Sequence, residues 1–280
     1  MHRRARQLLE FRRSFVPLLR RFKTTSFSQY GEDVLLRQLL PQERGFYIDV
    51  GAGHPWEHSN TYRLYLRGWS GITVEPNVSA AALFKRMRPR DTHLTLGISA
   101  TASQLTYYRF KDPFLNTFDG NRLAKPQGDP VDQVAVDCTP LRQVVSTYCP
   151  DALIDLLSVD CEGLDYEVLA SLDWDVSRPS VIIVEDFQQF FAVGRDSTPS
   201  RLRTYLQDLD YAPVAQCIFS FIYVDTTAFR QPGRSTGFRL DQSQVRGLRR
   251  KSAADLRAKA TDSAVPLDQH QERPTSGGGG

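Results

Sequence analysis

The chain has 280 residues, of which 41% are hydrophobic, and this content is enough to fill a core and excludes a wholly disordered protein. Its formal net charge is +3, but residues 1–25 carry +7 and residues 230–280 carry +5, which leaves −9 for the segment between them and argues against a nucleic-acid partner. No apolar run approaches the roughly 18 residues of a membrane span, and the first 25 residues lack the apolar stretch of a secretory signal, so we predict a cytoplasmic protein. The four cysteines form no CxxC pair, so we predict neither a zinc knuckle nor a disulfide framework.

The two ends differ in composition from the middle of the chain. Residues 1–25 intersperse arginines with Leu and Phe, which predicts a basic amphipathic segment, interrupted near Pro17. This segment either packs on the domain or rests weakly on anionic lipid, which would place the protein at the inner membrane surface. Residues 230–280 are poor in aromatics and end in four glycines, so we predict a disordered tail with a short helix near 244–259. The domain itself is predicted to span 26–229.

Within this domain, short apolar runs alternate with stretches of helical spacing. Strands are predicted at 46–50, 71–75, 93–99, 105–110, 133–138, 153–160, 180–185, 214–218 and 221–225. Helices are predicted at 60–67, 78–87, 141–148, 166–172 and 201–209, and a loop at 114–131. The alternation predicts an α/β fold with a doubly wound, mostly parallel sheet and an antiparallel terminal hairpin.

A glycine-rich turn follows the first strand, with Asp49, Gly51 and Gly53 in the sequence Asp-Val-Gly-Ala-Gly. Such glycines let the backbone approach a ligand at the open end of a parallel sheet. Dinucleotide folds want a third glycine three positions later, where this chain has Trp56. Glu75 ends the next strand, 22 residues after Gly53, where a carboxylate can accept ribose hydroxyls; otherwise it is a surface acid before a turn. This pattern favours S-adenosylmethionine over a dinucleotide.

Five sequence blocks between Phe27 and Asp225 resemble the FkbM family of S-adenosylmethionine-dependent methyltransferases. They are Ser28-Gln-Tyr-Gly-Glu-Asp33, Gly45-Phe-Tyr-Ile-Asp-Val-Gly-Ala-Gly53, Ser59-Asn-Thr61, Gly68-Trp-Ser-Gly-Ile-Thr-Val-Glu-Pro-Asn77 and Ser158-Val-Asp-Cys-Glu-Gly163. The first block is similar to the subgroup found among bacterial polysaccharide genes. The resemblance implies the class I methyltransferase (Rossmann-like) fold and O-methylation of sugar or polyketide hydroxyls.

The resemblance also implies roles for individual residues. Asp49, Gly51 and Gly53 would hold the methionine moiety of the cofactor, and Glu75 its ribose. The strand end at Gly97 to Ser99 would lie on the adenine side. Asn60 and Thr61 would open the first helix beneath the cofactor, unless Asn60 is only its cap. Residues 29–33 either fold back over the pocket or cap an N-terminal helix.

Acids gather at the ends of two later strands, at Asp160, Glu162, Glu185 and Asp186. Four neighbouring carboxylates repel one another unless a positive group lies between them, either the sulfonium of the cofactor or Mg²⁺. A metal would use Asp160, Glu185 and Asp186. Without a metal, Asp160 or Glu162 would be the general base, with Glu185 a further candidate catalytic acid. The alternative for Glu162 is a carboxylate that only stabilises a helix N-terminus.

Further residues are weaker candidates for the site. His54 and His58 follow the glycine turn and are considered as bases, although a solvent-facing histidine is the commoner case. The stretch Asn116-Thr117-Phe118 falls in the long loop and is a candidate for acceptor binding.

We therefore expect an O-methyltransferase that acts on a hydroxyl of a sugar or glycan in surface-polysaccharide biosynthesis, with a lipid-linked acceptor if residues 1–25 touch lipid. Two alternatives stay open. One is a non-catalytic interaction protein that keeps the methyltransferase fold, against which the intact set of acids argues. The other is a nicotinamide-dependent oxidoreductase, which the missing third glycine disfavours.

Overall fold

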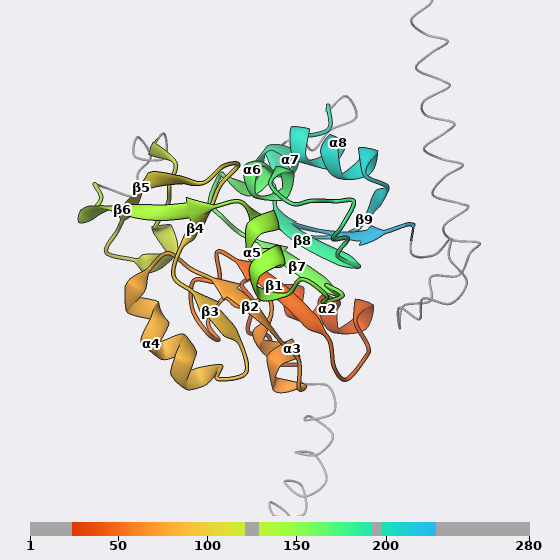
Figure 1. Cartoon of the computed structure of the whole chain (residues 1–280). Coiled ribbons are helices and arrows are strands. Elements are labelled where there is room, and N and C mark those ends of the chain that lie inside the picture. The colour runs from red at the N-terminus through yellow and green to blue at the C-terminus, as the bar shows by residue number, and fades with distance from the viewer. Residues whose placement is uncertain (1–23, 121–128, 192–197, 228–280) are drawn as a thin grey trace, which may run out of the picture. The chain divides into compact units, whose positions relative to one another are not determined.

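The computed structural model describes residues 24–120, 129–191 and 198–227 (Figure 1). These residues all lie within one compact unit, residues 1–237. The predicted basic segment, apart from its last two residues, and the predicted tail lie outside the described residues. Within the described ranges, no helix combines the length and the apolarity that a membrane span requires.

The main sheet has seven strands in the order β3-β2-β1-β7-β8-β10-β9. Its strands are β1 Phe46–Val50, β2 Ser70–Val74, β3 Thr92–Leu94, β7 Leu156–Val159, β8 Val181–Glu185, β9 Tyr211–Cys217 and β10 Ser220–Asp225. The neighbours from β3 to β8 are parallel, whereas β10 is antiparallel to both β8 and β9. This confirms the predicted doubly wound, mostly parallel sheet with an antiparallel terminal hairpin.

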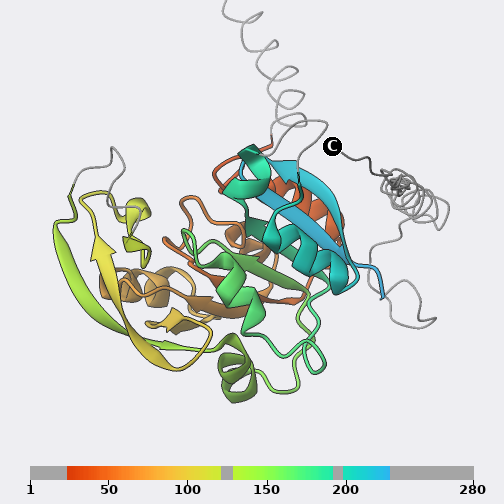
Figure 2. The same ribbon diagram turned by 90° about the horizontal axis from the view of Figure 1, so that it is seen from above.

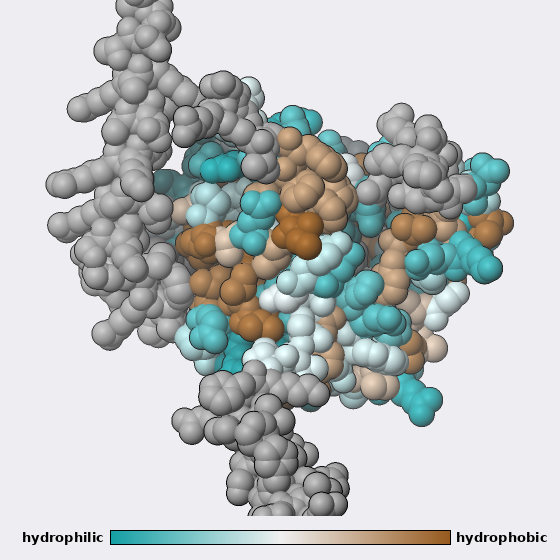
Figure 3. All heavy atoms as spheres, turned by 180° about the vertical axis from the view of Figure 1, so that it is seen from behind, coloured by the Kyte–Doolittle hydropathy of each residue, from teal (hydrophilic) through white to brown (hydrophobic). Residues whose placement is uncertain are grey.

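Helices cover both faces of this sheet (Figure 2). They are α2 Glu32–Leu39, α3 Tyr62–Leu66, α4 Val78–Met87, α5 Leu141–Tyr148, α6 Asp165–Ala170, α7 Phe187–Phe191 and α8 Arg201–Asp208. The inner strands are mostly apolar because both of their faces are buried, as in Leu157 and Ile182, which have no exposed surface. Seen from behind, apolar side chains also gather on part of the surface (Figure 3).

A second, three-stranded sheet has the order β4-β6-β5, with β4 Gly97–Ile98, β5 Ser103–Arg109 and β6 Asp132–Thr139. It corrects one prediction, because the single strand expected at 93–99 is divided between the two sheets, as β3 and β4. The strand predicted at 133–138, for which the sequence named no partner, pairs with β4 and β5, and this agrees with its alternating exposed and half-buried residues.

The described part of the predicted loop is also partly ordered. It begins with a short 3₁₀ helix, η1, at Pro113–Leu115, and Thr117 then forms a β-bridge with Tyr108. The sequence also did not predict α7, because five residues are too few to display a helical period.

The chain reverses direction across the sheet between β1 and β7. From β1 the chain builds outward to β3, and it then returns to place β7 on the other side of β1. In open α/β sheets, the crevice at the carboxyl ends of such strands is where ligands bind.

Candidate functional site

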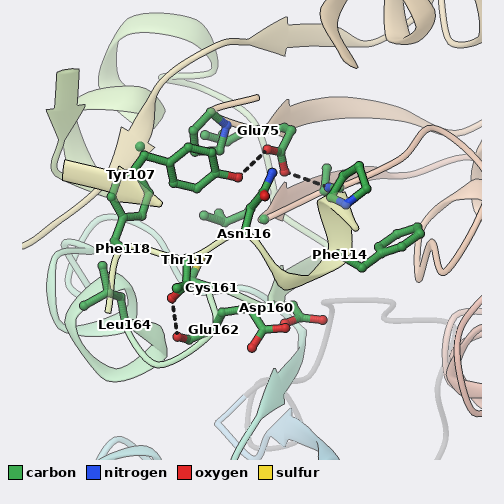
Figure 4. A pocket seen from close by; sticks show the side chains of 18 of the residues that line it. Glu75, Tyr107, Phe114, Asn116, Thr117, Phe118, Asp160, Cys161, Glu162 and Leu164 are labelled. Carbon is green, nitrogen blue, oxygen red and sulfur yellow. Dashed lines mark hydrogen bonds between the residues drawn. The ribbon is translucent and has the colours of Figure 1, made fainter. Parts of the chain in front are cut away.

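A cavity of about 310 Å³ lies at the carboxyl edge of the sheet. This volume is within the usual range for a small-molecule site. Residues that line it include Gln29, Gly51, Gly53, His58, Glu75, Gly97, Ile98, Tyr107, Phe114, Asn116, Thr117, Phe118, Asp160, Cys161 and Glu162. Figure 4 shows Glu75 and Tyr107 at one end of the cavity and Asp160 and Glu162 at the other.

The glycine turn forms one wall of the cavity. Gly51 and Gly53 have φ angles of 77° and 54°, in the left-handed region that favours glycine. The amides of Gly51 and Ala52 both donate to the carbonyl of Val74, at 2.9 and 3.0 Å. The end of β1 is thereby tied to the end of β2, and the turn brings bare backbone to the cavity.

Glu75 lies buried at the end of β2, with 5% of its surface exposed. Its Oε2 accepts a hydrogen bond from the amide of Gly53 at 2.9 Å, and its Oε1 accepts from the amide of Asn77 at 2.8 Å and from the hydroxyl of Tyr107 at 3.2 Å. Burial raises the pKa of Glu75, and these three hydrogen bonds oppose the shift. The predicted ribose acid is thus a cavity residue bonded to the glycine turn, not a surface acid.

Asp49, Asn60 and Thr61 are placed beneath the cavity wall rather than among the residues that line it. The hydroxyl of Thr61 donates to Asp49 at 2.5 Å and accepts from the buried guanidinium of Arg88 at 2.9 Å. The side-chain amide of Asn60 donates to Ser158 Oγ at 3.3 Å. These side chains connect the elements under the site.

Two further predictions at this end of the cavity concerned Asn60 as a helix cap and Ser99 on the adenine side. The amide of Tyr62, at the start of α3, donates to Ser59 Oγ at 3.1 Å, so Ser59 rather than Asn60 serves the helix start. Ser99 is not among the lining residues, and its hydroxyl donates to the carbonyl of Thr101 at 2.6 Å. Its neighbours Gly97 and Ile98 do line the cavity.

At the other end of the cavity, the structure brings together three of the four predicted acids, of which Asp160 and Glu162 line the cavity and Glu185 does not. Asp160, Glu162 and Glu185 each offer a carboxylate oxygen, and these atoms all lie within 4.8 Å of one another. Asp186 is not part of this group, because its carboxylate accepts from the amide of Gln189 at 2.9 Å and from the hydroxyl of Ser200. It therefore joins α7 to the start of α8.

The backbone of Glu162 adopts φ 53°, an uncommon conformation for a residue other than glycine. Two elements stabilise this turn. Asp165 accepts hydrogen bonds from the amides of Cys161 and Gly163, at 2.9 and 3.1 Å. The hydroxyl of Thr117 donates to the carbonyl of Glu162 at 3.2 Å. Asp165 is thus an acid that stabilises the turn before α6.

Two roles were predicted for the Ser-Gln-Tyr-Gly-Glu-Asp block, to fold back over the pocket or to cap an N-terminal helix, and its residues divide between a place at the cavity and a structural role. Gln29 lines the cavity, and its side-chain amide donates to the hydroxyl of Tyr30 at 3.0 Å. The pKa of Tyr30 is raised first by burial and then by the negative charges of Glu185, Glu32 and Asp160, so Tyr30 lies near the acid end. Asp33 instead has a structural role, accepting from Arg63 of α3 at 3.0 Å.

Of the two candidate histidines, His54 and His58, only His58 lines the cavity. The centroid of its ring lies 4.5 Å from that of Phe114. The ring of His54 accepts from the amide of Glu57. Sequence reasoning missed Tyr107 and did not assign Cys161 a role, although both line the cavity. The half-buried strand predicted at 105–110 includes Tyr107, but no motif marks its hydroxyl.

The chain is similar to three solved structures, at low identity and low TM-score. The O-methyltransferase of Bacillus cereus in complex with SAH shares 13% identity, with 75% of this chain and 87% of that chain covered and a TM-score of 0.37. A proposed O-methyltransferase from Klebsiella pneumoniae has 13% identity, 70% and 80% coverage and a TM-score of 0.39. A proposed caffeoyl-CoA O-methyltransferase from Staphylococcus aureus has 10% identity, 78% and 96% coverage and a TM-score of 0.37. At these scores the three structures carry no argument about the site.

Sequence comparison is more decisive. No sequence among the curated proteins matches the chain. The Methyltransferase FkbM domain, however, matches residues 49–213, which is more than half of the chain and includes the glycine turn, Glu75 and the three clustered acids. The chain therefore belongs to the FkbM family of S-adenosylmethionine-dependent methyltransferases.

Proposed function

We propose that this protein transfers a methyl group from S-adenosylmethionine to a hydroxyl of a sugar or glycan. The observation that carries the proposal is the division of one cavity into two chemically different ends. Glu75 and the glycine turn lie at one end, and Asp160 and Glu162 lie at the other, with the carboxylate of Glu185 clustered beside them. A methyltransferase needs one place for the cofactor and one for the acceptor, because the methyl group and the acceptor oxygen must meet in line.

The residues present fit S-adenosylmethionine. Five of the described lining residues are acids, and none of the described ones is Lys or Arg; the acids are Glu57, Glu75, Asp112, Asp160 and Glu162. Such a lining favours a cofactor that carries a sulfonium and an ammonium group, and disfavours the pyrophosphate of a nicotinamide cofactor. Glu75 would accept from the ribose, and the backbone at Gly51 and Gly53 would contact the methionine moiety.

The chain itself supplies alignment and a proton acceptor. When bound, S-adenosylmethionine provides a methyl group on a positively charged sulfur, and the acceptor oxygen must approach that carbon from the opposite side. Asp160 or Glu162 takes the proton of the attacking hydroxyl, and Glu185 increases the negative potential around them. The hydrogen bond from Thr117 holds the turn that carries Glu162.

A sugar acceptor suits the acid end because a sugar presents several hydroxyl donors to carboxylate acceptors. Tyr30, whose side chain is 37% exposed, adds an aromatic surface near this end. The similarity of the Ser28 to Asp33 block to a polysaccharide-associated subgroup supports a role in surface-polysaccharide synthesis.

Binding of the cofactor is the first test. Calorimetric titration with S-adenosylmethionine should give micromolar affinity, and Glu75→Ala should weaken it about tenfold or more, whereas Glu43→Ala, a control at an exposed acid, should not. An absence of binding under all conditions would favour the non-catalytic interaction protein. Binding of NAD instead would favour the oxidoreductase.

Methyl transfer is the second test, with radiolabelled S-adenosylmethionine and a panel of methyl glycosides of glucose, mannose, galactose and rhamnose. Asp160→Asn should abolish transfer while the cofactor still binds. A requirement for Mg²⁺, and loss of transfer in EDTA, would instead support a metal among the clustered acids. Failure of every glycoside, with the cofactor bound, would argue against a simple sugar acceptor.

A further inference from the structure

Tyr107 reaches the cavity from the second sheet, outside every sequence block that resembles the family. It lies on β5, opposite Val134 of β6, and is 5% exposed. Its ring packs against Phe118, with the ring centroids 4.8 Å apart, and its hydroxyl donates to Oε1 of Glu75 at 3.2 Å. Figure 4 shows this hydrogen bond across the end of the cavity.

The hydrogen bonds of Glu75 leave little room for a ligand. A carboxylate has about four acceptor positions, two on each oxygen. The amide of Asn77 and the hydroxyl of Tyr107 occupy both positions on Oε1, and the amide of Gly53 occupies one on Oε2. The remaining position is on Oε2. Tyr107 therefore completes the set of donors that fixes the rotation of the carboxylate and directs one acceptor position toward a ligand.

The charged and titratable groups around Glu75 come from three elements besides its own. Asp49 on β1 carries a like charge that disfavours ionisation of Glu75. Cys161, which follows β7, stays a neutral thiol because burial raises its pKa. Tyr107 on β5 provides the side-chain hydrogen bond to the carboxylate, and its own pKa is raised by burial, so it remains a donor. Of these groups, Tyr107 is the one that favours an ionised Glu75.

We infer that Tyr107 is a positioning residue that holds the carboxylate of Glu75, oriented and ionised, for one hydroxyl of the ribose of the cofactor. The inference rests on the proposed function, because it requires that Glu75 contact the cofactor. It assigns to the second sheet a part in cofactor binding.

The test compares Tyr107→Phe with Tyr108→Phe, a control at the next residue of the same strand, whose side chain points to the opposite face. The dissociation constant of S-adenosylmethionine is measured by calorimetry between pH 5 and pH 9. In the unaltered protein, affinity should fall on acidification, because protonated Glu75 loses acceptor capacity. In Tyr107→Phe, the midpoint of this fall should move up by about one pH unit, whereas in Tyr108→Phe it should stay in place.

Two results would overturn the inference alone. One is an equal loss of affinity at every pH in Tyr107→Phe, which would show that the hydroxyl does not act through the ionisation of Glu75. The other is no change at all, which would show that the residue contributes only the packing of its ring. Glu75→Gln provides a second test if Tyr107→Phe does not fold: it should abolish the pH dependence, and a retained dependence would overturn the inference. If the unaltered protein binds no S-adenosylmethionine at any pH, the proposed function fails first, and this inference falls with it.

Discussion

Gly51 and Asp160 meet where β1 and β7 end: a Cβ atom at Gly51 would lie 1.8 Å from the main-chain oxygen of Asp160. No rotamer change relieves this contact, because both groups belong to the backbone. The amide of Asp160 also donates to the carbonyl of Val50 at 3.0 Å, so the two strands are tied together at this point. The close approach of these two strand ends joins the cofactor turn to Asp160, one of the two acids that we propose as the base.

We expect Gly51→Ala to separate the two strand ends, lowering the unfolding midpoint and abolishing binding of S-adenosylmethionine. Gly31→Ala is the matched control, because Gly31 also has a positive φ, 91°, but a Cβ there would meet nothing within 4 Å. Its cost should be limited to backbone strain, about 1 to 2 kcal/mol. Equal effects of the two substitutions, measured by thermal unfolding and calorimetry, would show that the contact at Asp160 is unimportant.

Thr117→Val should lower the rate of methyl transfer about tenfold and leave the affinity for S-adenosylmethionine unchanged. The substitution removes the hydroxyl that donates to the carbonyl of Glu162, so the turn in the left-handed conformation loses one of its two supports. Thr117→Ser keeps the hydroxyl and should restore the rate. A loss of rate shared by both variants would point to packing rather than to the hydrogen bond.

The acid-rich lining should distinguish the cofactor from its product. S-adenosylmethionine carries one more positive charge than S-adenosylhomocysteine, so it should bind about tenfold more tightly at low ionic strength. Added salt should narrow the difference, and so should Asp160→Asn. Competition binding at two salt concentrations measures the ratio of the two affinities. If neither salt nor Asp160→Asn changes this ratio, the acids do not face the sulfonium.

Arg88 and Asp91 form a buried ion pair beneath the site, with 2.7 Å between Nε and Oδ2. We expect Arg88→Met to cost about 3 to 5 kcal/mol in the free energy of unfolding, because it leaves the charge of Asp91 buried and unpaired. The double variant Arg88→Met/Asp91→Asn should recover part of this loss. Strict additivity in chemical denaturation would show that the pair is not coupled.

His93 should make the fold sensitive to mild acid. Burial, with the nearby charge of Arg88, lowers the pKa of His93 to about 4, below the value of 6.5 for an exposed histidine. The unfolded chain then binds a proton more readily than the folded one, so stability should fall by about 2 to 3 kcal/mol as the pH drops from 6.5 to 4. His93→Asn should remove this part of the pH dependence, measured by urea unfolding. An unchanged slope would assign the acid sensitivity to other groups.

Much of the main sheet could be predicted from the sequence because its inner strands are apolar runs bounded by glycines and acids, as in Phe46–Val50 and Val181–Glu185. The place of β6 could not, because periodicity predicts a strand without naming its partner. Similarly, the acids at 160, 162, 185 and 186 look alike in sequence. The structure sets Asp186 apart, because it accepts hydrogen bonds from Gln189 and Ser200, whereas the other three carboxylates cluster within 4.8 Å.

The α/β alternation, the family and the acids that could carry chemistry follow from local periodicity and short motifs, which can be read along the chain. Which side chains share a cavity depends instead on how distant elements pack in three dimensions. Tyr107 meets Glu75 across 32 positions and Thr117 meets Glu162 across 45, and both pairs depend on where the second sheet packs. Contacts over such separations arise from the packing of whole elements, which no local pattern encodes.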